Sequence, residues 1–180
     1  MVEAINKKEE PILNQIGEFE KVSLAQFEAA MRETYFLKYD LNDLYDDIRL
    51  PARATAGSAG YDFFAPFDFT LQPGESIKIP TGIRVRMEPG WFLLGIPKSG
   101  LGTKYRIQLD NTAFAIDGDY YHSDNEGHIF VKLTNSTLDN RVLSLRAGDK
   151  FVQGIFLPYG ITYSDNAVGT RNGGFGSTGR

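Results

Sequence analysis

Between residues 51 and 163 the chain alternates short apolar runs with clusters of Gly, Pro, Asn and Asp. Runs of this length, rich in β-branched and aromatic residues and bounded by turn residues, predict β-strands. No strong helical periodicity separates them, so the pattern favours an all-β, jelly-roll-like barrel of two sheets. The expected strands are Tyr61–Phe64, Ser76–Ile79, Ile83–Met87, Trp91–Ile96, Arg106–Leu109, Ile129–Thr134, Val142–Leu145 and Phe151–Leu157.

Turns are expected at residues 72–75, 88–90 and 146–149, where glycine stands just before the next strand. Glycine adopts the positive φ that such turns demand without steric cost.

A helix is predicted from Val22 to Phe36. Ser23 and Gln26 have the spacing of a capping box, and Val22 and Phe27 have that of a hydrophobic staple. Residues 1 to about 20 are polar and are expected to form a loosely ordered arm, whereas the acidic stretch 42–47 suits a short helical turn. We therefore divide the chain into a helical extension (1–47), a β-barrel (48–163) and a glycine-rich arm (164–180).

Composition excludes several kinds of site. Among 180 residues there is no cysteine, so disulfides and thiolate catalysis are ruled out. The net charge of -4 argues against nucleic acid as a direct partner. No apolar run reaches membrane-spanning length, and no secretory signal is visible at the start, so no membrane partner and a cytoplasmic location are expected.

The candidate chemistry lies in residues 109–120, LDNTAFAIDGDY. If the apolar run within this stretch is extended, Asn111 and Asp117 share one face of the strand. Gly118 is the expected turn. The functional interpretation is an amide that reads a polar ligand edge and a carboxylate that activates water. The alternative, a hairpin with solvated aspartates, stays open.

The C-terminal stretch also has two interpretations. It is either a flexible glycine-rich tail or a lid for a phosphate ligand. In a lid, the guanidinium of Arg171 would supply charge, Phe175 would stack on a base, and Ser177 and Thr178 would bind anionic oxygens.

Five segments, in order, resemble the motifs of the trimeric dUTPase family (deoxyuridine triphosphate nucleotidohydrolases), and the resemblance covers roughly residues 48 to 180. The segments are Arg53–Asp62, Pro97–Gly102, Ala115–Tyr120 with Asn111 ahead of it, Ala147–Ile155 and Gly173–Gly179. The resemblance implies a β-clip jelly-roll homotrimer with shared active sites. Such an enzyme hydrolyses dUTP to dUMP and pyrophosphate, which limits uracil in DNA and supplies dUMP for dTMP synthesis.

For the base and sugar, the resemblance implies four roles. Asp117 would be the general base that activates water toward the α-phosphorus. Asn111 and the backbone around Ile116 would read uracil. Tyr120 would pack beneath the deoxyribose and leave no room for a 2′-hydroxyl.

For the phosphates, the resemblance implies contacts from Lys98, Ser99, the amide of Gly100, and Gln153. Asp62 would hold Mg²⁺, the expected cofactor, through water only. The arm of another subunit would close over the base and γ-phosphate. Its contributing residues are Arg171, Phe175, Ser177 and Thr178.

Three features depart from the family pattern. Lys98 stands where an Arg is usual, and an ammonium cannot reproduce the bidentate fork of a guanidinium. Arg171 precedes Phe175 by four residues instead of five. The loop 121–126 is longer than the usual tight turn, which predicts a lengthened hairpin. It carries acidic side chains and flanking histidines, which we interpret as solvated loop residues instead of metal ligands.

Two alternative functions remain at this point. A dCTP deaminase of the same superfamily would need a Glu beside the base, and none lies between Asn111 and Tyr120. A nucleotide-dependent signalling or binding protein on the same fold would use the N-terminal helix and the 121–126 loop as contact surfaces.

Overall fold

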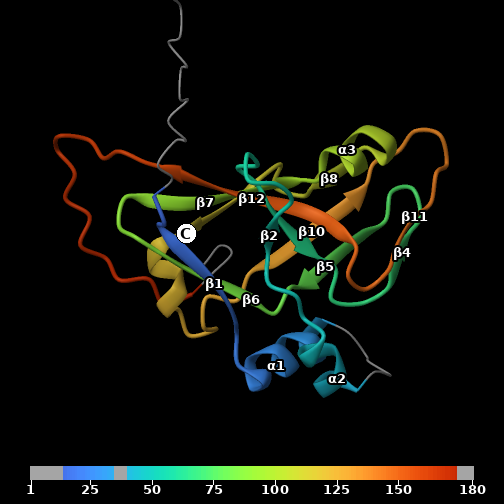
Figure 1. The fold of residues 1–180 in the computed structure, drawn as a ribbon, viewed down its shortest axis with the longest axis horizontal. Coiled ribbons are helices and arrows are strands. Elements are labelled where there is room, and N and C mark those ends of the chain that lie inside the picture. The colour runs from blue at the N-terminus through green and yellow to red at the C-terminus, as the bar shows by residue number, and fades with distance from the viewer. Residues whose placement is uncertain (1–13, 35–39, 174–180) are drawn as a thin grey trace, which may run out of the picture.

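The computed structural model describes residues 14–34 and 40–173 (Figure 1). Strands dominate, as the alternating pattern predicts. The elements in order are β1 (Gly17–Lys21), α1 (Leu24–Thr34), α2 (Leu41–Asp46), β2 (Ala52–Arg53), β3 (Tyr61–Phe64), β4 (Phe69–Leu71), β5 (Ser76–Pro80), β6 (Ile83–Met87), β7 (Trp91–Pro97), α3 (Ser99–Tyr105), β8 (Ile107–Leu109), β9 (Phe114–Asp117), the 3₁₀ helix η1 (Gly118–His122), β10 (Phe130–Asn135), β11 (Leu143–Leu145) and β12 (Lys150–Pro158).

The strands form four antiparallel sheets. The largest has the order β2-β3-β12-β7-β9, and a second has the order β5-β10-β8. The pairs β1-β6 and β11-β4 complete the described strands. This arrangement confirms the all-β prediction, and each of the eight predicted strands is present with its ends shifted by at most one residue.

The core lies between the sheets, because alternate residues of each strand point inward. In β6, for example, Ile83 and Val85 are buried while the two arginines beside them are not. Phe63, Leu93 and Phe151 are almost fully buried in the same cluster. Gly95 is required here, since a Cβ at this position would lie 1.9 Å from the Phe114 ring.

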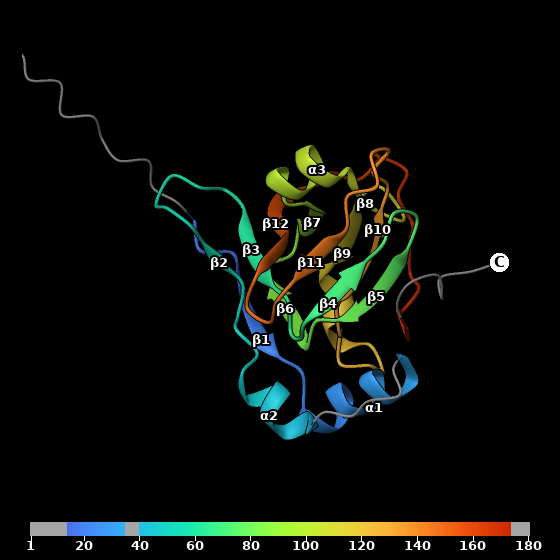
Figure 2. The same ribbon diagram turned by 90° about the vertical axis from the view of Figure 1, so that its right-hand side faces the viewer.

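The predicted turns are confirmed by positive φ at Gly74, Gly90 and Gly148. The helical turn expected in the acidic stretch is also present, as α2. In both views α1 and α2 gather at one end of the strands, and α3 lies at the opposite end (Figures 1 and 2). Within the described ranges, no helix has the length and apolar character needed to cross a bilayer.

The expectation of a loosely ordered arm up to residue 20 was wrong for its last residues, which form β1. The cause is cross-strand pairing of charge: Glu18 lies opposite Arg86, and Glu20 lies opposite Arg84. Their ion pairs measure 2.9 and 2.8 Å. Phe19, between the two glutamates, points into the core.

Sequence reasoning also missed three elements of the barrel, β2, β4 and α3. The first two have only two and three residues, too few to show a period. The helix α3 contains two glycines and buries no side chain, so its sequence carries no amphipathic pattern.

The predicted cap of α1 is half confirmed. The backbone N–H of Gln26 donates to the Ser23 hydroxyl at 3.1 Å. The reciprocal bond, which a capping box assigns to the Gln26 side chain, comes from elsewhere: Ser23 donates its backbone N–H to Glu126 at 2.7 Å. The described helix ends at Thr34, and the predicted end at Phe36 lies outside the described residues.

Candidate active site

The first cluster of candidate residues surrounds β9, an edge strand paired with β7. Asp117 ends the strand, opposite Phe92, with about half of its side chain (51%) exposed. Ile116 points the other way and is buried, as the period of two requires. A water molecule can therefore reach the Asp117 carboxylate from solvent.

Asn111 does not share the strand with Asp117, so the expectation of one common strand face was wrong. Thr112 has φ of 69°, and Asn111 lies in the turn that precedes β9. The exposed Asn111 side chain lines a mainly apolar cavity of about 310 Å³. The cavity is lined by Lys78, Asp110, Asn111, Phe114, Phe130 and Lys132.

The chain turns at Gly118, as expected, but by a different device. Gly118 begins the 3₁₀ helix η1, and its φ is not among the positive values. This helix buries Tyr120, whose hydroxyl donates to the backbone oxygen of His128 at 2.7 Å. Asn125 donates its amide to the same hydroxyl at 2.8 Å. Burial raises the pKa of Tyr120, so the phenol stays neutral.

Arg171 reaches this cluster from the C-terminal stretch of the same chain. Its guanidinium pairs with Asp117, lies 3.0 Å from Asp119 and sits 5.8 Å from the centre of the Tyr120 ring. The supply of Arg171 by a neighbouring subunit thus stays a prediction. The other expected arm residues, Phe175, Ser177 and Thr178, lie outside the described residues.

The second cluster lies where β7 gives way to α3. Lys98 is the N-cap residue, and Ser99 and Gly100 form the exposed first turn of α3. Amides in the first turn of a helix have no acceptor inside the helix, so they can bind anionic oxygens. Gln153 packs against the first motif, where a Cβ on Gly60 would lie 2.6 Å from its side-chain oxygen.

Asp62 is the hub of this second cluster and is 2% exposed. One carboxylate oxygen lies 2.6 Å from the Lys98 ammonium, and the other lies 2.8 Å from that of Lys150. Burial raises the pKa of Asp62, but the hydrogen bonds from Lys150 and Lys98 outweigh it and hold the pKa below its usual value. We missed Lys150, although its place beside Asp149 in the fourth motif could have indicated it.

The two clusters are far apart within one chain. In the five-stranded sheet, Asp62 lies level with Ile96 of β7, and Asp117 lies level with Phe92. The strands β12 and β7 also lie between β3 and β9. At the usual rise and strand spacing, the two carboxylates are about 20 Å apart. One nucleotide cannot place a single reacting phosphate beside both.

Residues 46–179 match the family model described as dUTPase. The chain belongs to the dUTPase family. It is 40% identical over 135 residues to a deoxyuridine 5'-triphosphate nucleotidohydrolase of Lactococcus lactis, which covers 73% of this chain and 89% of that relative. With the corresponding protein of Hahella chejuensis it shares 36% identity over 159 residues, 83% and 99% of the two chains.

Solved dUTPases have the same fold. A dUTPase from Streptococcus mutans superposes with a TM-score of 0.59 at 31% identity, covering 80% of this chain and 97% of the other. A dUTPase from phage phi11 of S. aureus superposes at 0.56 with 20% identity, covering 69% and 92%. The match to the dUTPase model begins near the end of α2, so β1 and α1 lie outside it.

Proposed function

We propose that this dUTPase hydrolyses dUTP to dUMP and pyrophosphate with Asp117 as its general base. The observation that carries the proposal is the exposed Asp117 carboxylate at the end of β9, one 3₁₀ turn from the buried Tyr120. An exposed carboxylate can orient a water toward the α-phosphorus and accept its proton as the new bond forms.

The cluster around β9 would bind the base and sugar. Asn111 has a donor and an acceptor for a pyrimidine edge and lies at an apolar cavity. The fixed hydroxyl of Tyr120 holds its ring in place, so a sugar 2′-hydroxyl pressed against the ring would lose its partners in water. Rejection of UTP follows from that loss.

The cluster around α3 would bind the triphosphate. Ser99 and Gly100 offer a hydroxyl and first-turn amides, and Lys98 adds positive charge beside them. Gln153 would donate near the same phosphates. A chain of phosphates fixed at several points is held for in-line attack, which supplies much of the rate enhancement in phosphoryl transfer.

The separation of about 20 Å between the clusters supports an active site built from two chains. We propose a homotrimer in which the β9 cluster of one subunit faces the α3 cluster of the next. The arm with Arg171 and Phe175 would close the site. Arg171 would then exchange its own Asp117 for the substrate phosphates.

Magnesium needs a separate test against the residues present. The dUTPase of phage phi11 has been described with a structural Mg(II) ion. In this chain both oxygens of Asp62 already face lysine ammonium groups, which would repel a cation. The arrangement therefore does not fit Mg²⁺ anchored on Asp62, and no step of the reaction is assigned to the metal.

A dCTP deaminase is not favoured. Such an enzyme would need a glutamate beside the base, and the glutamate closest in sequence, Glu126, is bound to Ser23 through both carboxylate oxygens.

The test is pyrophosphate release from dUTP, dCTP, dTTP and UTP by the wild type and by Asp117→Asn. Asn is nearly isosteric with Asp but cannot take the proton, so we expect turnover of dUTP alone, and a loss of about a thousandfold or more in the variant. Binding of the non-hydrolysable analogue dUpNHpp should survive the substitution. A folded wild type that binds dUpNHpp without hydrolysing dUTP would contradict the proposal.

A further inference from the structure

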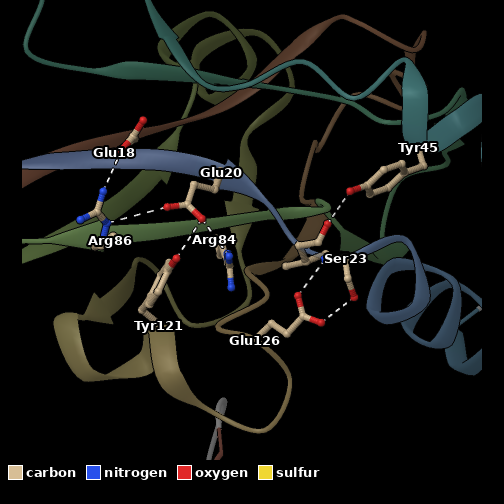
Figure 3. A network of polar contacts seen from close by, with 9 residues as sticks. Glu18, Glu20, Ser23, Tyr45, Arg84, Arg86, Tyr121 and Glu126 are labelled. Carbon is tan, nitrogen blue, oxygen red and sulfur yellow. Dashed lines mark hydrogen bonds and ion pairs between the residues drawn. The ribbon is translucent and has the colours of Figure 1, made fainter.

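Two segments that the dUTPase motifs leave unexplained contact each other. One is the N-terminal segment β1–α1, residues 17–34, which precedes the matched region 46–179. The other is the loop 121–126, which follows the candidate base and sugar residues. Figure 3 shows how closely their polar side chains meet.

The first contact is the helix cap. Glu126 accepts the Ser23 backbone N–H at 2.7 Å through one carboxylate oxygen and the Ser23 hydroxyl at 2.5 Å through the other (Figure 3). Burial raises the pKa of Glu126, but these two hydrogen bonds outweigh it and keep the pKa below its usual value. A carboxylate of the loop thus completes the N-terminal cap of α1.

The second contact holds the beginning of the loop. Tyr121 donates its hydroxyl to Glu20 of β1 at 2.8 Å. The guanidinium of Arg84, which pairs with the same glutamate, lies 4.5 Å from the centre of the Tyr121 ring. The Tyr121 side chain is therefore fixed at its hydroxyl and on its ring face by β1 and β6 together.

The loop in turn holds the residue that would read the sugar. Tyr121 directly follows Tyr120 in η1, and Asn125 donates to the Tyr120 hydroxyl at 2.8 Å. The loop also packs tightly on itself, because a Cβ on Gly127 would lie 2.7 Å from the Tyr121 Cα. Contacts at both ends of the loop thus limit the movement of Tyr120.

We propose that Glu126 and Tyr121 are positioning residues, which anchor the 121–126 loop on the N-terminal segment so that Tyr120 keeps its place beneath the sugar. This inference rests on the proposed function and extends it, because it makes β1–α1 a part of the specificity apparatus. Neither Glu126 nor Tyr121 needs to touch the nucleotide.

The test measures kcat and KM for dUTP and for UTP in Ser23→Ala and Glu126→Ala, together with the thermal midpoint. Asp124→Ala is the matched control, since Asp124 is an exposed carboxylate of the same loop. We expect both anchor variants to raise KM for dUTP and to lower the dUTP-to-UTP ratio of kcat/KM about tenfold, because small displacements of a positioning group are costly. The control should keep wild-type values.

A double variant, Ser23→Ala with Glu126→Ala, should be no worse than either single variant, because both remove one contact. If Glu126→Ala does not fold, Tyr121→Phe removes only the hydroxyl bonded to Glu20 and should shift the ratio in the same direction. Variants with a lower midpoint but wild-type KM and substrate ratio would overturn the inference and leave a purely structural cap. A wild type inactive on dUTP would contradict the proposed function itself.

Discussion

The two clusters of the candidate site hold their functional groups in opposite ways. Around Asp62 the groups are charged, and ion pairs with two lysines keep them in place. Around Tyr120 they are neutral and buried, and hydrogen bonds to a backbone oxygen and an amide fix the phenol. A triphosphate calls for charge that can move to meet it, whereas discrimination between sugars calls for a rigid surface.

The largest expected effect tests whether the two clusters act across a subunit boundary. Asp117→Asn disables one cluster and Lys98→Met disables the other, so each homo-oligomer should be nearly inactive. In doubly tagged hetero-oligomers, roughly a third of the sites of a trimer should combine two intact halves and recover activity.

Activity of the purified mixtures measures this recovery. Pairing Asp117→Asn with Asn111→Ala is the matched control, because both substitutions lie on the same half and no intact site can form. Absence of recovery in the first mixture would place the whole site within one chain.

The next effect concerns acid. His128 is buried, accepts the Gly82 N–H at 2.8 Å and provides the backbone oxygen for Tyr120. Burial lowers the pKa of His128 to about 4 from an ordinary value of 6.5. The unfolded chain therefore binds a proton first as pH falls. The stability is fully present above pH 6.5, and roughly 3 kcal/mol of it should be lost between pH 6.5 and 4.

Urea unfolding at several pH values measures this loss. The variant His128→Gln can keep an acceptor for Gly82 but cannot titrate, so its stability should change much less over the same range. The Asp62 cluster should be insensitive there, because the pKa of Asp62 is below 3.8 when folded and its contribution is lost only in stronger acid. Equal pH slopes in wild type and variant would refute the role of His128.

The smallest effect concerns Asp62→Asn. It leaves two lysines facing a neutral amide and should destabilise the fold by about 2 kcal/mol, less than a fully buried pair because the lysines are partly exposed. The Mg²⁺ concentration that gives half-maximal activity should stay unchanged. A marked rise in that concentration would show that Asp62 holds the metal after all.

Much of the barrel could be predicted from local sequence, because strand period and turn glycines are local signals. The strand β1 was missed although Glu18, Phe19 and Glu20 alternate, since its partners Arg84 and Arg86 come much later in the chain. No local pattern reveals such complementarity. The short helix α3 was missed because it packs no apolar face.

For the site, the motifs indicated which residues to examine but not how they pair. The second lysine on Asp62 and the bond between Ser23 and Glu126 depend on register and loop path, which three-dimensional packing decides. Likewise, the positive φ of Thr112, which removes Asn111 from the strand, is unusual for a β-branched residue and has no signal in the sequence.

The cap on α1 also bears on how the chain acquires its structure. Ser23 and Glu126 are 103 positions apart, so their contact must close a long loop and is expected to form late in folding. During synthesis β1 and α1 leave the ribosome before β6 and the loop 121–126 exist. The earliest part of this dUTPase to be made is thus among the last to gain its partners, and until then its strand edge is open to wrong pairing.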